Sequence, residues 1–145
     1  MQIAVLLYDR FTALDAIGPF DTLGRLTDAE VVFVSQRPGP VRTDNGSLAL
    51  VADKGLDEVT RPDVLVVPGG PHPERETANP VVLDWLRAVD AGTTWTTSVC
   101  TGSLLLGAAG LLDGRRATST GCTWSSWPAS GRGPPASGWC STGST

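Results

Sequence analysis

Four short runs of strand-forming residues divide the chain and predict a central sheet. Three are apolar and nearly continuous, and the fourth is a β-prone run that ends just before Cys100. A continuous apolar run, rather than an alternating one, is typical of a parallel strand buried on both faces. Two further short runs flank Asp44-Asn45-Gly46 and predict a β-hairpin outside that sheet. The predicted strands span residues 3–8, 30–35, 64–67 and 95–99, and the hairpin arms span 41–43 and 47–51.

Helical spacing of apolar residues fills the gaps between these strands. Residues 13–23 have apolar side chains at roughly helical intervals, although Gly18-Pro19 should break or restart the helix. Asp15 is then expected in a loop or in the first helical turn. Residues 79–91 predict an amphipathic helix, with Asn79 as its cap and Pro80 at its first position. A third helix is expected in the small-residue and leucine run after Cys100.

The alternation of strands and helices predicts an α/β fold, a three-layer sandwich with a mostly parallel sheet and helices on both faces. Ligands of such sheets bind at the carboxyl ends of the strands. Three features follow predicted strands and are expected to meet at that edge. They are Asp15, the pair Gly69-Gly70, and Cys100.

Cys100 is the strongest candidate for chemistry. The predicted strand ends at this cysteine and passes without a linker into the predicted helix, so the chain must turn sharply there, as at a nucleophile elbow. Backbone N–H groups at the start of a helix favour a thiolate over a thiol. The alternative is an inert, buried cysteine, because cysteine is often a small core residue.

Composition and charge narrow the function. The chain has 145 residues, a net charge of -4 and no cluster of basic residues, which argues against nucleic acid or an anionic membrane as partner. A small-molecule substrate is expected instead. The chain begins without a basic leader and contains no 18-residue apolar run, which favours the cytoplasm. Three cysteines without metal-ligand spacing and one histidine, His72, predict no metal site.

Residues 119–145 form an irregular tail that differs from residues 1–118. The tail is rich in Ser, Gly, Thr and Trp and contains no Leu, Ile, Val, acidic residue or Lys. One interpretation is a disordered segment. The other is a reading-frame shift near Thr118, since a chain with ten Arg and one Lys suggests GC-rich coding DNA. Reading one nucleotide earlier permits an amphipathic helix and then a strand, which favours the shift.

Three motifs together resemble the DJ-1/PfpI superfamily, and within it the isonitrile hydratases. The resemblance covers residues 1 to about 118, and the sequence departs from the family pattern from Ser119 onward. The motifs are Leu14-Asp15-Ala16-Ile17-Gly18-Pro19-Phe20-Asp21, Val66-Val67-Pro68-Gly69-Gly70, and Thr97-Ser98-Val99-Cys100-Thr101-Gly102-Ser103 continuing to Gly114-Arg115-Arg116-Ala117-Thr118.

The resemblance implies a flavodoxin-like sheet and assigns roles to individual residues. Cys100 would be the nucleophile, Asp15 its acid–base partner, and the N–H groups of Gly70 and Thr101 donors to a developing anion, with Gly69 in the same substrate-binding turn. It further implies a homodimer and a hydration that requires no metal or organic cofactor. Because the family domain is longer than the matching part, the resemblance leaves open whether this chain is active.

Each assignment has a plain structural alternative. Asp15 could cap a helix, and Gly69-Gly70 could be an ordinary tight turn. His72, between two prolines, is expected in a solvated loop, and Thr101 stands where peptidase-like members have histidine. Two other functions remain open by resemblance: the sensor domain of an AraC-type transcription regulator, and a glyoxalase or deglycase. In the latter the acidic partner is typically glutamate, whereas Asp15 points to the hydratase branch.

Overall fold

A five-stranded parallel sheet forms the centre of the computed structural model, which describes residues 1–115 and 117–119. The strands lie in the order β5-β2-β1-β6-β7, and all four pairings are parallel. Their bounds are β1 Gln2–Leu6, β2 Glu30–Ser35, β5 Lys54–Gly55, β6 Val64–Val67 and β7 Trp95–Ser98. The four strands predicted from the sequence are therefore confirmed, and β1 lies in the middle as its continuous apolar run indicates.

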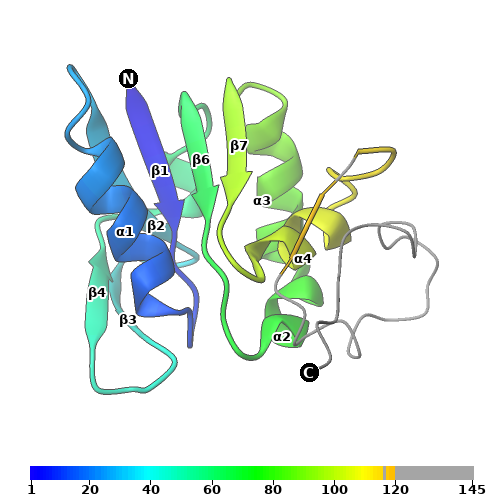
Figure 1. Cartoon of the computed structure of the whole chain (residues 1–145), viewed down its shortest axis with the longest axis horizontal. Helices are drawn as coiled ribbons and strands as arrows, with labels where there is room; N and C mark the ends of the chain where they lie inside the picture. Colours follow the sequence, from blue (N-terminus) through cyan, green and yellow to red (C-terminus); the bar gives the residue numbers. More distant parts are fainter. Residues whose placement is uncertain (116, 120–145) are drawn as a thin grey trace, which may run out of the picture.

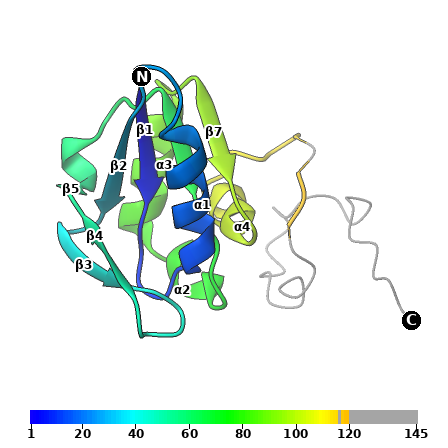
Figure 2. The ribbon, with the colours of Figure 1, turned by 60° about the vertical axis from the view of Figure 1, so that its left-hand side comes forward.

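Helices cover both faces of this sheet. The helix α1 (Ala13–Leu23) packs on one face, and α3 (Pro80–Asp90) packs on the other (Figures 1 and 2). The chain moves from β1 to β2 in one direction and from β6 to β7 in the opposite direction. Right-handed crossovers in opposite directions place their helices on opposite faces, so the strand order itself explains the three layers.

Gly18-Pro19 does not break the first helix, contrary to the prediction. The helix α1 runs through Pro19 without interruption. Proline has a helix-compatible φ and removes one backbone hydrogen bond, while its ring crowds the carbonyl four residues earlier and the residue before it. Glycine at position 18 has no Cβ and so removes part of this crowding. The stacked rings of Phe20 and Phe33, with centroids 5.4 Å apart, anchor the second half of the helix to β2.

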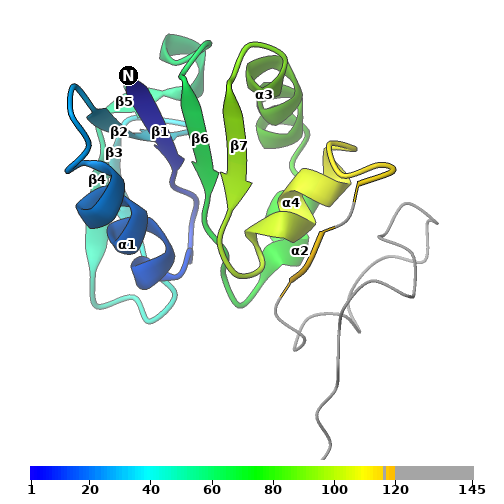
Figure 3. The same ribbon diagram turned by 45° about the horizontal axis from the view of Figure 1, so that its top comes forward.

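The hairpin is confirmed as a separate two-stranded antiparallel sheet. Its strands are β3 (Gly39–Arg42) and β4 (Ala49–Ala52), and they lie beyond β2, at the side of the main sheet (Figure 3). Asn79 occupies the position before α3, but its side chain makes no capping hydrogen bond, contrary to the expected cap. Its amide instead donates to Glu76 Oε2 at 3.0 Å.

Three short elements have no counterpart in the sequence prediction. They are the two-residue strand β5, a 3₁₀ turn at Leu56–Glu58, and the helix α2 (Pro73–Thr77). The helix α4 (Gly102–Ala108) follows β7 and packs against β6, β7, α2 and α3. Within the described ranges, no helix is long and apolar enough to cross a membrane. The predicted tail, residues 119–145, lies outside the described residues except for Ser119.

Candidate active site

Three chain segments meet at the carboxyl edge of the sheet, as the sequence predicts. Asp15 lies in the first turn of α1 after β1, Gly69 and Gly70 follow β6, and Cys100 follows β7. Because β1, β6 and β7 are adjacent and parallel, their carboxyl ends lie next to one another. The Gly69-Gly70 turn occupies the middle position and contacts both of the other segments.

Cys100 lies at a sharp turn between strand and helix. Parallel pairing continues up to this point, since the Val99 N–H donates to the Val67 carbonyl at 3.0 Å. Cys100 itself has a φ of 55°, in the left-handed region that residues other than glycine seldom adopt. Cys100 is exposed, so it is not a buried core residue. This geometry is that of a nucleophile elbow.

Asp15 is held against the glycine turn. The Gly69 N–H donates to Asp15 Oδ2 at 3.0 Å, and Asp15 is only 7% exposed. A Cβ added to Gly69 would lie 2.5 Å from the Thr101 backbone nitrogen and 2.9 Å from the Cβ of Cys100. The carboxylate and the elbow therefore approach one another across a backbone position that has room only for glycine.

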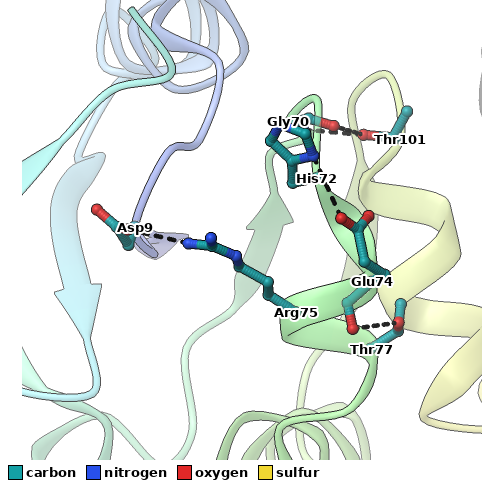
Figure 4. Close-up of polar contacts among 7 residues, drawn as sticks. All are labelled: Asp9, Gly70, His72, Glu74, Arg75, Thr77 and Thr101. Atoms are coloured by element: carbon teal, nitrogen blue, oxygen red, sulfur yellow. Dashed lines mark hydrogen bonds and ion pairs between the residues drawn. The ribbon is translucent and has the colours of Figure 1, made fainter. Parts of the chain in front are cut away.

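Thr101 forms hydrogen bonds with Gly70, the second glycine of the turn. The Gly70 N–H donates to Thr101 Oγ1 at 2.8 Å, and the same hydroxyl donates to the Gly70 carbonyl at 2.8 Å (Figure 4). The Gly70 N–H is thus already engaged in this structure. Its expected role as a donor to a developing anion stays a prediction, and it would require the Thr101 hydroxyl to give way to substrate.

Replacing Thr101 by valine should destabilise the fold by about 2 kcal/mol, because both polar groups of the buried Gly70 peptide lose their partner. Chemical denaturation measures the change. Thr96→Val is the matched control, since Thr96 Oγ1 is buried without a hydrogen-bond partner, and its loss should be neutral or stabilising. Thr101→Ser should retain most of the stability. Equal effects of the two valine variants would contradict the proposed role of Thr101.

Tyr8 is a site residue that the sequence analysis did not single out. Its hydroxyl donates to the Pro68 carbonyl at 2.9 Å, directly before the glycine turn. Burial raises the pKa of the Tyr8 phenol above its ordinary value, and the nearby Glu76, Asp15 and Cys100 act in the same direction. The phenol therefore stays protonated and keeps its hydrogen bond. A tyrosine that ends an apolar run, with one polar atom to satisfy, was the available signal.

His72 is exposed, as expected, although it directly precedes α2 rather than lying in a plain loop. Its Nδ1 lies 3.2 Å from Glu74 Oε1, two residues further along the chain (Figure 4). In the described part of the chain, no group of three or more His, Cys, Asp or Glu side chains could hold a metal ion.

These features define a parallel α/β protein with a cysteine at a strand-to-helix elbow and a carboxylate from the first helix beside it. The model of the DJ-1/PfpI family matches residues 1–123. The chain belongs to the DJ-1/PfpI family, in agreement with the sequence-based resemblance.

Relatives of known name cover several activities. An isonitrile hydratase of Pseudomonas putida is 40% identical over 119 residues, which are 82% of this chain and 52% of the hydratase. The HTH-type transcriptional regulator CdhR of Pseudomonas aeruginosa is 40% identical over 80 residues, 55% of this chain and 23% of the regulator. A deglycase of Pyrococcus abyssi is 31% identical over 121 residues, 82% of this chain and 72% of the deglycase.

Solved structures agree with the fold. A ThiJ/PfpI family protein from Pseudomonas syringae has a TM-score of 0.72 and 36% identity, covering 76% of this chain and 46% of that one. Oxidized DJ-1 of Toxoplasma gondii has a TM-score of 0.74 and 28% identity, and the match covers 92% of this chain and 74% of that one. The chain thus spans about half the length of the hydratase and of the first of these structures.

Proposed function

We propose that the protein hydrates an isonitrile to an N-substituted formamide, with Cys100 as nucleophile and Asp15 as acid–base partner. One observation supports the pairing. The Gly69 backbone lies against both residues. Its nitrogen is 3.0 Å from Asp15 Oδ2, and a Cβ added to Gly69 would lie 2.9 Å from the Cys100 Cβ. The similarity to isonitrile hydratase supports the substrate class.

The first step joins sulfur to the isonitrile carbon. The Asp15 carboxylate takes the thiol proton and passes it to the isonitrile carbon, while the Cys100 sulfur attacks the same atom. The product is a thioimidate, in which carbon has gained one hydrogen and one bond to sulfur. Asp15 is again a carboxylate at the end of this step.

The second step adds water and releases the cysteine. The Asp15 carboxylate removes a proton from water, and the hydroxide attacks the thioimidate carbon. Asp15 returns that proton to the nitrogen. Collapse of the adduct then breaks the carbon–sulfur bond while the hydroxyl proton of the adduct passes to the departing sulfur, giving a formamide and the free thiol. We assign the backbone N–H groups of Gly70 and Thr101 to stabilise negative charge during this step.

Replacing Asp15 by asparagine tests the acid–base role. An amide accepts the hydrogen bond from the Gly69 N–H but cannot exchange the proton, so turnover should fall by about 10²–10⁴-fold while the fold persists. Formamide release from an alkyl isonitrile, measured by the formyl proton signal, follows the reaction. The control is Asp21→Asn on the same helix, whose side chain is 64% exposed and pairs with Arg25. Full activity in the Asp15 variant would exclude its proton transfer.

A deglycase or glyoxalase is the second candidate, supported by the similarity to the deglycase of Pyrococcus abyssi. Turnover of methylglyoxal without any formamide from isonitriles would favour it. A sensor domain is the third candidate, supported by the similarity to the regulator CdhR. Saturable isonitrile binding without turnover, in a chain whose Cys100 still reacts with iodoacetamide, would favour that function.

The proposal also includes a homodimer acting on a small molecule in the cytoplasm. The helix α1 carries Leu14, which is 74% exposed, and Ile17, which is 36% exposed and lies three residues further along the same face. Exposed apolar side chains on one helix face support a surface that a second copy covers. A monomeric sedimentation coefficient at micromolar concentration would contradict the pairing.

A further inference from the structure

A cavity adjoins the cysteine site at Tyr8, which is common to both. It has a volume of about 580 Å³ and opens at the carboxyl ends of β1 and β2. Cys100, Asp15 and Gly69 do not line it. The hairpin strand β3 borders it on one side and α2 on the other (Figures 2 and 3). We call this cavity the β1–β2 groove; the polar side chains that line it include Tyr8, Asp9, Ser35, Arg37, Arg42 and Glu76.

Ser35 lines the groove and contributes a hydroxyl group to it. The residue is only 8% exposed, yet its side chain makes no hydrogen bond to any residue that the structure describes. Because Ser35 lines the groove and no group of the described residues engages its hydroxyl, the hydroxyl is available to a ligand bound there.

The hairpin side of the groove is basic. Arg37 and Arg42 both line it, and neither forms an ion pair within the described residues. The guanidinium of Arg42 donates only to the Gly46 carbonyl, at 3.2 Å. Two guanidinium groups without carboxylate partners are suited to bind a carboxylate.

The opposite side of the groove is acidic. Asp9 follows β1 and Glu76 comes from α2, and both line the groove. Arg75 is the neighbouring cation, with its guanidinium 3.8 Å from Asp9 Oδ2 (Figure 4). Burial raises the pKa of Glu76, and Asp9 acts in the same direction, while the hydrogen bond from Asn79 and the charge of Arg75 oppose the rise. A bound ammonium group would favour the ionised carboxylates at this end.

Apolar side chains lie between the two charged ends. Tyr8 and Val82 are buried, and Leu7 lies beside them at the end of β1. We propose that the β1–β2 groove binds a small zwitterion, a free α-amino acid with an apolar side chain. Its carboxylate would face Arg37 and Arg42, its ammonium would face Asp9 and Glu76, and Ser35 would complete the hydrogen bonding.

A zwitterion fits better than a simple anion or cation because it is complementary to both charged ends of the groove, whereas a simple ion is complementary to only one. The volume agrees with a small ligand, since small-molecule pockets span roughly 300–1,000 Å³. The position also agrees, because ligands of parallel sheets collect beyond the carboxyl ends of the strands.

Binding of L-leucine to the 145-residue chain tests the proposal, measured by calorimetry and by saturation transfer from protein to ligand protons. Two matched probes each remove one charge: L-leucinamide lacks the carboxylate, and N-acetyl-L-leucine lacks the ammonium. L-leucine should bind saturably, and each probe should bind about tenfold more weakly or worse. Ser35→Ala should weaken leucine binding several-fold, whereas Arg25→Gln, at an exposed position just after α1, should not change it.

The charge variants show which end holds which group. Arg37→Gln should reduce the preference for L-leucine over L-leucinamide, and Glu76→Gln should reduce the preference over N-acetyl-L-leucine. Absence of saturable leucine binding at millimolar concentration would overturn the proposal, as would equal binding of all three probes. Loss of binding in Cys100→Ser would place the ligand at the cysteine site instead. No turnover is involved, so this test is independent of the hydratase assay.

Discussion

Replacing Cys100 by serine is expected to abolish formamide formation. A serine hydroxyl is a far weaker nucleophile than a thiolate and leaves the carbon adduct less readily, so the covalent intermediate should not form. Removing a nucleophile from a group of residues that act as a unit costs on the order of a thousandfold or more in turnover. The steady-state rate with an alkyl isonitrile measures the loss, and the mass of the intact chain shows whether an adduct forms.

The fold should survive this substitution. Cys100 is exposed, and serine differs from it only in the terminal atom, so the free energy of unfolding should change little. A double variant, Cys122→Ser with Cys140→Ser, is the matched control, because it removes the other two cysteines of the sequence. The control should remain active. Substantial turnover by the Cys100 variant with an unchanged fold would rule out the covalent mechanism.

The meeting of Asp15, Gly69 and Cys100 could be predicted from the sequence. Each follows a run of residues that forms a buried strand, and parallel neighbouring strands end at the same edge. The hydrogen bond between the Thr101 hydroxyl and Gly70 could not be predicted, because it joins two loops 31 residues apart and depends on how the Thr101 side chain is placed. The same holds for Tyr8, whose hydroxyl reaches a carbonyl 60 residues away.

The errors in the predicted fold have physical causes. Elements of two to five residues, such as β5 and α2, are too short to show a period, so tertiary contacts decide their structure. The sequence rule for Gly18-Pro19 treats proline as a helix breaker, but the glycine before it, which has no Cβ, relieves part of the crowding, and α1 continues through Pro19. Asn79 stands where a cap is expected, yet Glu76 engages its amide.

The β1–β2 groove was not foreseen because no motif encodes it. Ser35 is the last residue of an ordinary strand, and the acidic and basic side chains come from four separate segments. Only the strand order brings the ends of β1 and β2 together and places the hairpin opposite α2. The cysteine site follows from motifs within the family, whereas the groove follows from this arrangement of the chain.

Replacing Gly102 by alanine should disrupt the elbow more than any other single methyl addition among the glycines described. A Cβ at Gly102 would overlap the Val67 carbonyl oxygen and lie 2.9 Å from that of Pro68. Both obstacles are backbone atoms at the end of β6, so neither can move aside as a flexible side chain can. We expect a destabilisation of about 3 kcal/mol or more, measured by denaturation.

The same substitution should also lower turnover beyond what the loss of stability explains. Moving the start of α4 away from β6 displaces Cys100 from Gly69, and a shift of about 1 Å at a reacting group costs roughly a hundredfold. Gly92→Ala is the control, because its Cβ would meet only the flexible side chain of Arg61, at 3.2 Å. That variant should retain both stability and activity. Wild-type stability in Gly102→Ala would mean that β6 and α4 do not pack as closely as the structure places them, and the elbow geometry assigned to Cys100 would then be wrong.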